Sequence, residues 1–259
     1  MPYKLSIITI NLNNSSGLKK TCLSVITQTF RKFEWIIIDG GSVDNSVDII
    51  KHYSDYIAYW ISESDSGVYN AMNKGIKNAT GEYLLFLNSG DYLLHPWTLQ
   101  EAIDEVKTAQ NIDVYYSDAV LNTYQLRKSP QEVTLDFFIK GMINHQNCII
   151  KRELFNHRLY DENYQIVADW YFFIQELIDY KITFLHIKTN IAIFDTSGIS
   201  NNTTEKYFAE RHYILKKLNI GNETEIGFLA FRILRKIKNK LPYRLFKLIK
   251  LFKNFLYDK

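Results

Sequence analysis

Short apolar runs alternate with helical patterns along the first hundred residues of the chain. Three of these runs, Lys4–Asn11, Phe33–Asp39 and Tyr83–Leu87, are almost continuously apolar. Such runs are typical of strands that are buried on both faces of a sheet. The segments between them carry apolar residues at helical spacing. This alternation predicts an α/β fold with a Rossmann-like, mostly parallel central sheet flanked by helices.

The first helix is expected soon after the first strand. Ser15 or Ser16 can cap its N-terminus, and Leu18, Cys22 and Val25 form one apolar stripe along it. The other predicted elements are strands at 57–62, 114–117 and 147–150, and helices at 67–78, 98–108, 132–140, 168–179, 205–218 and 226–240, with a further helix beyond 242.

The charge of the chain is unevenly distributed. Phe228–Lys259 carries ten Lys or Arg and one acid, whereas residues 1–227 carry 21 Lys or Arg and 27 acids. We therefore expect a main domain at 1–220 and a basic tail of amphipathic helices at 221–259. Such helices bind the interface of an anionic membrane, although packing on the main domain would give the same pattern. No nucleic-acid-binding module is recognisable, so RNA is not expected as a partner.

The N-terminus and the cysteines bear on the compartment. MPYKLSIITINLNN lacks the charged segment and long apolar run of a signal peptide. No window reaches about 18 uninterrupted apolar residues, as a transmembrane helix would require. The two cysteines, Cys22 and Cys148, stand in apolar surroundings and are expected to be core thiols. These features predict a cytoplasmic protein, peripheral on the inner face of the plasma membrane if its tail binds lipid.

Polar loops follow each of the first four strands. They are Asn11–Asn14, Asp39–Ser42, Glu63–Gly67 and Asn88–Asp91. In a parallel sheet such loops meet at one edge, where backbone donors and helix N-termini are available to ligands. Any single loop can be explained by the needs of a turn and a helix cap. Four in succession instead indicate one continuous binding site.

These loops are acidic and lack a phosphate-binding lysine motif. Neither G-x-x-x-x-G-K-[ST] nor G-x-G-x-x-G occurs in the chain. A diphosphate near Asp91 would be repelled unless a divalent cation neutralised it. Mg²⁺ and Mn²⁺ can be held by one or two carboxylates and completed by phosphate oxygens. We therefore expect a metal-dependent diphosphate site.

Five stretches of the chain resemble the family-2 glycosyltransferases of the GT-A fold, in particular bacterial enzymes that build surface polysaccharides. They read ITINLNN, IIIDGGSVDNS, SESDSGVYNAMNKGIKNATGEYLLFLNSGD, HQNCIIKRELF and YQIVADWYFF, and they lie within residues 3–200. The resemblance implies an enzyme that transfers a sugar, with inversion, from a nucleotide-diphosphate sugar. It implies UDP-sugar as the donor and a hydroxyl of a glycan or polyprenyl-linked acceptor.

The resemblance places the donor and the metal at the strand ends. It implies that Asp39 binds the base, expected to be uracil, and that Asp91 binds Mn²⁺ or Mg²⁺. The family motif Asp-x-Asp reads Asn88-Ser89-Gly90-Asp91 here, so an amide replaces the first carboxylate. This departure leaves the identity of the metal open. The residues implied to line the nucleotide and donor pocket are Thr9, Asn11, Asp39, Ser42, Asp65, Asn70, Lys74 and Asn88.

The resemblance places the acceptor around the HQ pair and the acid of VADW. Asp169 is the candidate base that takes the proton from the acceptor hydroxyl. Partial burial against Trp170 is expected to raise its pKa. The alternative is an acid that only interacts with the dipole of its helix. His145 and Gln146 are expected to line a sugar pocket with Trp170 and Tyr69.

Two other functions match parts of the pattern. A sugar nucleotidyltransferase usually has a glycine-rich basic loop after the first strand, and NLNNSSGLKK is poor in glycine. The second alternative is a non-catalytic glycolipid-binding protein. Asn88 favours it, because an amide stands where the family motif has a carboxylate. Asp39, Asp91 and Asp169, the acids that catalysis would need, argue against it because all three are present. The acceptor, the linkage and the oligomeric state are not predicted by the sequence.

Overall fold

The structure is a computed structural model that describes residues 4–109, 111–196 and 204–220. The chain forms two compact units, Met1–Thr204 and Glu205–Lys259. In the second unit the described element is the helix α8 (Thr204–Lys217). The predicted basic tail and its membrane contact lie outside the described residues. Among the helices that the structure describes, none is long and apolar enough to cross a membrane.

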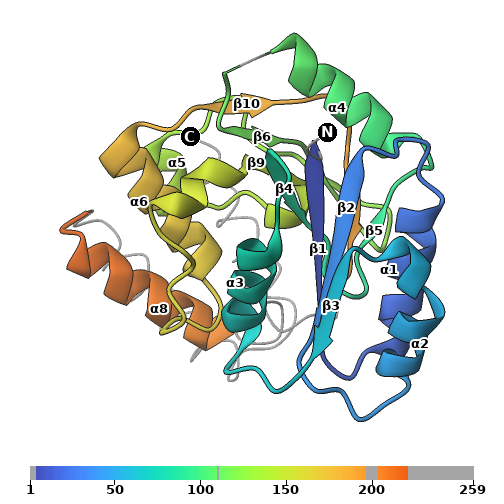
Figure 1. Ribbon diagram of the computed structural model, residues 1–259. Coiled ribbons are helices and arrows are strands. Elements are labelled where there is room, and N and C mark those ends of the chain that lie inside the picture. The colour runs from blue at the N-terminus through green and yellow to red at the C-terminus, as the bar shows by residue number, and fades with distance from the viewer. Residues whose placement is uncertain (1–3, 110, 197–203, 221–259) are drawn as a thin grey trace, which may run out of the picture. The chain divides into compact units, whose positions relative to one another are not determined.

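A seven-stranded sheet forms the centre of the first unit (Figure 1). Four adjacent strands, in the order β4, β1, β2, β3, are parallel, while β9 is antiparallel to both of its neighbours, β4 and β6. The edge strand β10 is parallel to β6, so both point in the same direction as the first four strands. Across the sheet the strands are β10 (Phe184–His186), β6 (Val114–Tyr116), β9 (Cys148–Lys151), β4 (Tyr83–Phe86), β1 (Leu5–Asn11), β2 (Phe33–Asp39) and β3 (Tyr59–Ser62).

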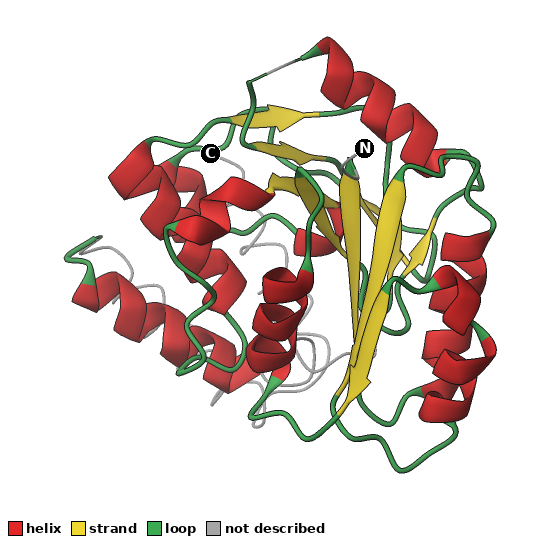
Figure 2. Ribbon diagram, in the orientation of Figure 1, coloured by secondary structure: helices red, strands yellow, loops and turns green. Residues whose placement is uncertain are grey.

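Helices cover both faces of this sheet. Figure 2, in the orientation of Figure 1, shows α1 (Ser15–Ile26) and α2 (Ser46–His52) beside one face and α3 (Val68–Asn78) beside the other. The other helices that the structure describes in this unit are α4 (Thr98–Thr108), α5 (Leu135–Lys140) and α6 (Ala168–Tyr180), with short 3₁₀ helices at Ser54–Tyr56, His145–Asn147 and Arg152–Asn156. The expected α/β class, with a mostly parallel sheet flanked by helices, is confirmed.

Alternate residues of the central strand β1 pack against the two helical layers. Leu5 and Ile7 belong to a core cluster that includes Cys22 of α1. On the opposite face, Gly75 of α3 lies against Ile8, and a Cβ on this glycine would clash with the isoleucine side chain. The missing side chain therefore lets α3 approach the sheet closely. Because both faces are covered, β1 is buried along its whole length.

A second, smaller sheet lies beside the main one. Its strands, in order, are β5 (Tyr92–Leu93), β11 (Ala192–Phe194), β7 (Ala119–Leu121) and β8 (Leu126–Arg127). None of them is among the elements that the sequence predicts. The antiparallel pairing of β11 with β5 brings Asp195, which follows β11, beside Asp91, which precedes β5.

The start of α1 differs from the expectation, and one further helix was not predicted. Asn14, and not Ser15 or Ser16, caps α1, because its side-chain oxygen accepts a hydrogen bond from the backbone N–H of Gly17 (3.1 Å). The unpredicted helix is α2, whose seven residues are too few for a clear helical period. Both cysteines of the chain are free and buried, as expected.

Candidate functional site

The polar loops that follow the parallel strands meet at one edge of the sheet. Asn11, Asp39 and Ser62 end β1, β2 and β3, and they lie opposite one another in the strand register. The backbone N–H of Ser89, in the loop after β4, donates to the carbonyl of Ile10 (3.0 Å). The four loops are therefore neighbours, at the edge where open parallel sheets bind ligands.

The carboxylate of Asp39 organises the ends of β1 and β2. It is fully buried and accepts hydrogen bonds from the amide of Asn11 (2.7 Å) and the hydroxyl of Ser62 (2.6 Å). The hydroxyl and the backbone N–H of Ser42 also donate to it (2.6 and 2.9 Å). Burial opposes ionisation, but these hydrogen bonds outweigh it and hold the pKa of Asp39 below its ordinary value. Asp39 is thus a charged and firmly held acceptor.

Two residues of β1 that were expected in the nucleotide pocket have different roles. Oδ1 of Asn11 is buried beside Asp39 and has no hydrogen-bond partner among the described residues. Thr9 is fully buried, and its hydroxyl accepts a hydrogen bond from the indole N–H of Trp35 (3.0 Å). Contrary to the expectation, Thr9 therefore belongs to the core.

The third loop holds a lysine between two acids. The ammonium of Lys74 lies 2.7 Å from Oε1 of Glu63 and 2.5 Å from Oδ1 of Asp65. Desolvation acts to lower the pKa of Lys74, but the two carboxylates outweigh it and raise the pKa above its ordinary value. The lysine is thus a permanent cation that is already neutralised, and it can meet a phosphate only if one of these acids releases it.

Asp91 is buried beside a second acid. Its Oδ1 accepts a hydrogen bond from the backbone N–H of Asp195 (2.8 Å). The Asp195 carboxylate lies over Gly90, where a Cβ would come within 2.8 Å of Oδ2, and Gly90 has a φ of 105°, which residues with a side chain rarely adopt. Burial raises the pKa of Asp91 to about 7, because it outweighs the opposing effects of the Asp195 N–H, of His145 and of a hydrogen bond from the buried Gln146.

The two acids match the divalent cation that the sequence predicts. Asp91 and Asp195 supply carboxylate oxygens, which Mg²⁺ and Mn²⁺ prefer, and one or two such ligands suffice when phosphate oxygens complete the coordination shell. Within the described ranges, no three or more His, Cys, Asp and Glu side chains gather so that they could hold a metal ion. The protein side chains thus form an incomplete ligand set, which fits a cation that binds together with a diphosphate.

Four side chains form a hydrogen-bonded chain that runs from the loop after β4, through the start of α6, to α3. Nδ2 of Asn88 lies 3.3 Å from Nε2 of His145, and Nδ1 of the same ring lies 2.7 Å from Oδ2 of Asp169. The other carboxylate oxygen of Asp169 accepts a hydrogen bond from the hydroxyl of Tyr69 (2.8 Å). The structure therefore connects Asp169, His145 and Tyr69, which were expected on the side of the acceptor substrate, with Asn88, which was expected in the pocket of the nucleotide sugar.

The surroundings of Asp169 differ from the expectation. Its burial acts to raise the pKa, but hydrogen bonds from His145, Tyr69 and the backbone N–H of Trp170 outweigh this effect and lower the pKa of Asp169 below its ordinary value. The expected increase of the pKa is therefore wrong. The ring of Trp170 is buried, and its indole N–H donates to the carbonyl of Phe138 (2.8 Å). Trp170 is thus a core residue, contrary to its expected place in a sugar pocket.

Comparison with known proteins identifies the family. Residues 6–165, more than half of the chain, match the family model described as glycosyl transferase family 2. The chain belongs to glycosyltransferase family 2. The PGL/p-HBAD biosynthesis glycosyltransferase of Mycobacterium bovis (strain BCG / Pasteur 1173P2) is 29% identical to it over 220 residues, which cover 83% of this chain and 86% of that protein.

Solved structures share the fold of this glycosyltransferase. S. aureus TarS 1-349 in complex with UDP-GlcNAc has a TM-score of 0.67 at 20% identity, over 87% of this chain and 71% of that one. Mannosyltransferase PcManGT from Pyrobaculum calidifontis, in complex with GDP-Man and Mn²⁺, has a TM-score of 0.64 at 12% identity, over 99% of this chain and 81% of that one. These likenesses establish the GT-A fold, as the sequence resemblance predicts.

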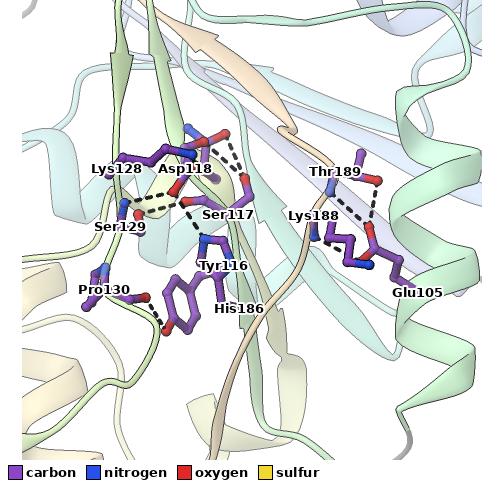
Figure 3. A network of polar contacts seen from close by, with 11 residues as sticks. Glu105, Tyr116, Ser117, Asp118, Lys128, Ser129, Pro130, His186, Lys188 and Thr189 are labelled. Carbon is purple, nitrogen blue, oxygen red and sulfur yellow. Dashed lines mark hydrogen bonds and ion pairs between the residues drawn. The ribbon is translucent and has the colours of Figure 1, made fainter.

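A further carboxylate lies after β6 of the glycosyltransferase and is satisfied entirely by the protein (Figure 3). Asp118 accepts hydrogen bonds from the ammonium of Lys128 (2.8 Å), the backbone N–H of Ser129 (2.8 Å) and the ring of His186 (3.1 Å). These donors come from the segment after β8 and from β10, so the network ties the smaller sheet to the main one. Both oxygens of Asp118 are occupied, and we assign it to the fold.

Sequence reasoning missed three acids, two of them, Glu162 and Asp195, beside predicted site residues and one, Asp118, in the fold. Glu162 accepts hydrogen bonds from Asn70 (2.9 Å) and Asn73 (2.8 Å) of α3, which anchor the segment that leads into α6. Asp195 follows a strand that was not predicted. Asp118 alone had a signal in the sequence, because it comes after a predicted strand, as the acids of the first loops do.

Proposed function

We propose that this protein transfers a sugar, with inversion at the anomeric carbon, from a UDP-sugar to a hydroxyl of a glycan or lipid-linked acceptor. Membership of glycosyltransferase family 2 supports the transfer itself. The observation on which the proposal rests is the grouping, around one sheet edge, of the Asp39 carboxylate, the acids Asp91 and Asp195, and the contact between His145 and Asp169. These are the base site, the diphosphate site and the proton acceptor that such a reaction requires.

Uridine is supported by the acceptors at the ends of β1 and β2. Uracil presents one N–H donor between two carbonyl groups. Oδ1 of Asn11 has no partner among the described residues, and a base that displaced one of the donors on the ionised Asp39 would find a second acceptor there. Proteins of this fold are known in complex with UDP-GlcNAc and with GDP-Man. We favour UDP because the family resemblance implies a UDP-sugar, and the two acceptors can be filled by the single N–H of uracil.

For the metal we propose Mn²⁺ or Mg²⁺, with Asp91 and Asp195 as the protein ligands. When bound, the cation neutralises the diphosphate as it leaves. The protein holds the two carboxylates together, because the N–H of Asp195 fixes Asp91 and the missing side chain of Gly90 leaves room for Asp195. The complex of PcManGT with GDP-Man and Mn²⁺ supports a metal in this fold.

For the acceptor we propose a growing glycan on a polyprenyl diphosphate, in the synthesis of a surface polysaccharide at the cytoplasmic face of the plasma membrane. The support is the composition of residues 221–259, in which basic and apolar residues alternate at helical spacing. Each Lys or Arg near an anionic membrane surface contributes about 1 kcal/mol to binding. The tail would thus hold the enzyme close to a lipid-linked acceptor.

Calorimetric titration of the purified protein with UDP, GDP and ADP, each with and without Mn²⁺, tests the proposal. We expect UDP with Mn²⁺ to bind more tightly than UDP alone and than either other nucleotide with Mn²⁺. NMR of the first product formed from a UDP-sugar then tests the stereochemistry, and retention at the anomeric carbon would overturn the inverting mechanism. Failure of all three nucleotides to bind would favour a non-catalytic glycolipid-binding protein.

A further inference from the structure

One side of α3 holds the part of the chain that delivers Asp169. Four polar side chains on this side donate hydrogen bonds to the chain at 160–169, which leads into α6. They are Ser66, just before the helix, and Tyr69, Asn70 and Asn73 within it. Residues that are three and four positions apart are neighbours on the surface of a helix. The four side chains therefore form one binding face for the chain at 160–169.

Asn73 binds this part of the chain as a neighbouring strand would. The residue is 3% exposed, and its Oδ1 accepts a hydrogen bond from the backbone N–H of Tyr160 (3.0 Å). Its Nδ2 donates to the carbonyl of the same residue (2.9 Å) and to Oε1 of Glu162 (2.8 Å). The amide cannot turn over without losing the two bonds to Tyr160, so it always presents a donor to Glu162.

Glu162 receives two further donors from the same face. Nδ2 of Asn70 lies 2.9 Å from Oε2 of Glu162, and the hydroxyl of Ser66 lies 3.4 Å from it. Desolvation acts to raise the pKa of Glu162, but the hydrogen bonds from Asn73, Asn70 and Ser66 outweigh it and hold the pKa below its ordinary value. Glu162 is thus an ionised acceptor that meets donors on both of its oxygens.

Ser66 connects this face with the loop 63–67, which was expected to border the donor. Asp65 in that loop lies beside Gly40, where a Cβ would come within 3.0 Å of Oδ2 of Asp65, and Gly40 directly follows Asp39. At the other end of the face, the hydroxyl of Tyr69 lies 2.8 Å from Oδ1 of Asp169. The loop beside the Asp39 site and the carboxylate of Asp169 are therefore attached to one side of one helix.

We propose that Glu162 is a positioning residue, which fixes Asp169 relative to the loop that borders the donor. This inference rests on the proposed glycosyl transfer with Asp169 as the proton acceptor. The hydroxyl oxygen forms a bond to the anomeric carbon as the bond from that carbon to the diphosphate oxygen breaks, and the diphosphate leaves with the electron pair. The hydroxyl proton passes to Asp169. The hydroxyl must thus fit between the donor and the carboxylate, so the distance between them has to be held.

The test is a pair of substitutions at positions 162 and 70. Glu162→Gln keeps the shape of the side chain, but its new amide N–H₂ must face the amide N–H₂ of Asn70 or of Asn73. Neither of these can turn over, because Oδ1 of Asn70 accepts from the N–H of Ser66 (3.4 Å) and Oδ1 of Asn73 accepts from the N–H of Tyr160. Asn70→Asp alone places a second carboxylate beside Glu162. In the double variant a donor at 162 faces an acceptor at 70, so each substitution should repair the other.

Turnover is measured with the full chain, Mn²⁺ and a panel of UDP-sugars, as UDP released when the sugar passes to water. Each single variant should lower turnover by roughly tenfold to 10²-fold, the order of loss that a misplacement of about 1 Å causes. The double variant should recover most of it. Glu162→Gln should leave the calorimetric affinity for UDP unchanged, because Glu162 acts on Asp169 and not on the nucleotide. Glu153→Gln is the control, since it removes an exposed glutamate that pairs with Lys151 (3.3 Å), and its turnover should match wild type.

Three outcomes would overturn the inference. They are normal turnover of Glu162→Gln, a loss of turnover matched by an equal loss of UDP affinity, and a double variant no better than the poorer single variant. Absence of UDP binding in the wild type would instead overturn the proposed function and the inference with it.

A second measurement covers the case in which transfer to water is too slow to follow. In the wild type, UDP with Mn²⁺ should slow hydrogen exchange of backbone amides both in the loop 63–67 and at 160–169, because Ser66 and Glu162 join the two. In Glu162→Gln the slowing should be confined to the loop, and in the double variant it should reach 160–169 again. Slowing that is confined to the loop in the wild type would overturn the inference without any measurement of activity.

Discussion

Asp91 is expected to destabilise the metal-free protein at neutral and alkaline pH. Burial raises its pKa from 3.8 to about 7, and each of these roughly three units corresponds to about 1.4 kcal/mol. Between the two pKa values the folded protein holds a proton that the unfolded chain has lost, so stability falls as the pH rises through this range. The full cost, about 4 kcal/mol, is present above the folded pKa, and it disappears below the unfolded pKa.

Replacement by asparagine should remove this cost. Asp91→Asn keeps an oxygen for the backbone N–H of Asp195 and loses only the charge. Urea unfolding without metal at pH 8 should find the variant more stable by up to about 4 kcal/mol, with a difference near zero at pH 4. Asp104→Asn, which removes an exposed carboxylate of α4, is the control and should change stability little. Equal stability of Asp91→Asn and wild type at pH 8 would refute the reasoning.

Three further predictions concern the donor site and the tail. Asp39→Asn replaces an acceptor oxygen with a donor that faces other donors, so it should lower the free energy of unfolding by about 2 kcal/mol. It should also weaken UDP binding, and an unchanged affinity in calorimetry would exclude Asp39 from the base site. Asp195→Asn keeps its backbone N–H on Asp91 but should weaken Mn²⁺ binding in the presence of UDP, and an unaltered electron paramagnetic resonance signal of free Mn²⁺ would remove Asp195 as a ligand. Truncation after Ile226 should leave a folded main domain that sediments less with anionic liposomes, and undiminished sedimentation would contradict the membrane proposal.

The grouping of the polar residues at the ends of the parallel strands could be predicted because its signals are local. Asp39, Asn88 and Asp91 follow buried apolar runs, and the rule that ligands bind beyond parallel strand ends needs no knowledge of distant partners. Asp195 could not be found in this way. It is brought to Asp91, 104 residues away, by β5 and β11, which have two and three residues and therefore no detectable alternation.

The chemistry of Asp169 depended on contacts that the sequence does not display. Its motif indicated a functional acid, and burial beside Trp170 argued for a raised pKa. Its hydrogen-bond partners are Tyr69, 100 residues away, and His145, 24 residues away, and together they reverse the direction of the shift. A local pattern can thus locate a carboxylate at a site, but its protonation depends on which donors the fold delivers to it.

The conformation of Gly90 restricts the evolutionary routes that are open to this enzyme. An acid at position 90, two residues after Asn88, would come closer to the Asp-x-Asp spacing, yet it would need a backbone φ of 105° and would collide with the carboxylate of Asp195. The Asp195 side chain could rotate away from such a residue, but the strain of the positive φ would remain whatever stands at position 195. The backbone of this loop therefore favours glycine at position 90, and with it a motif in which the acid comes one residue later, at Asp91.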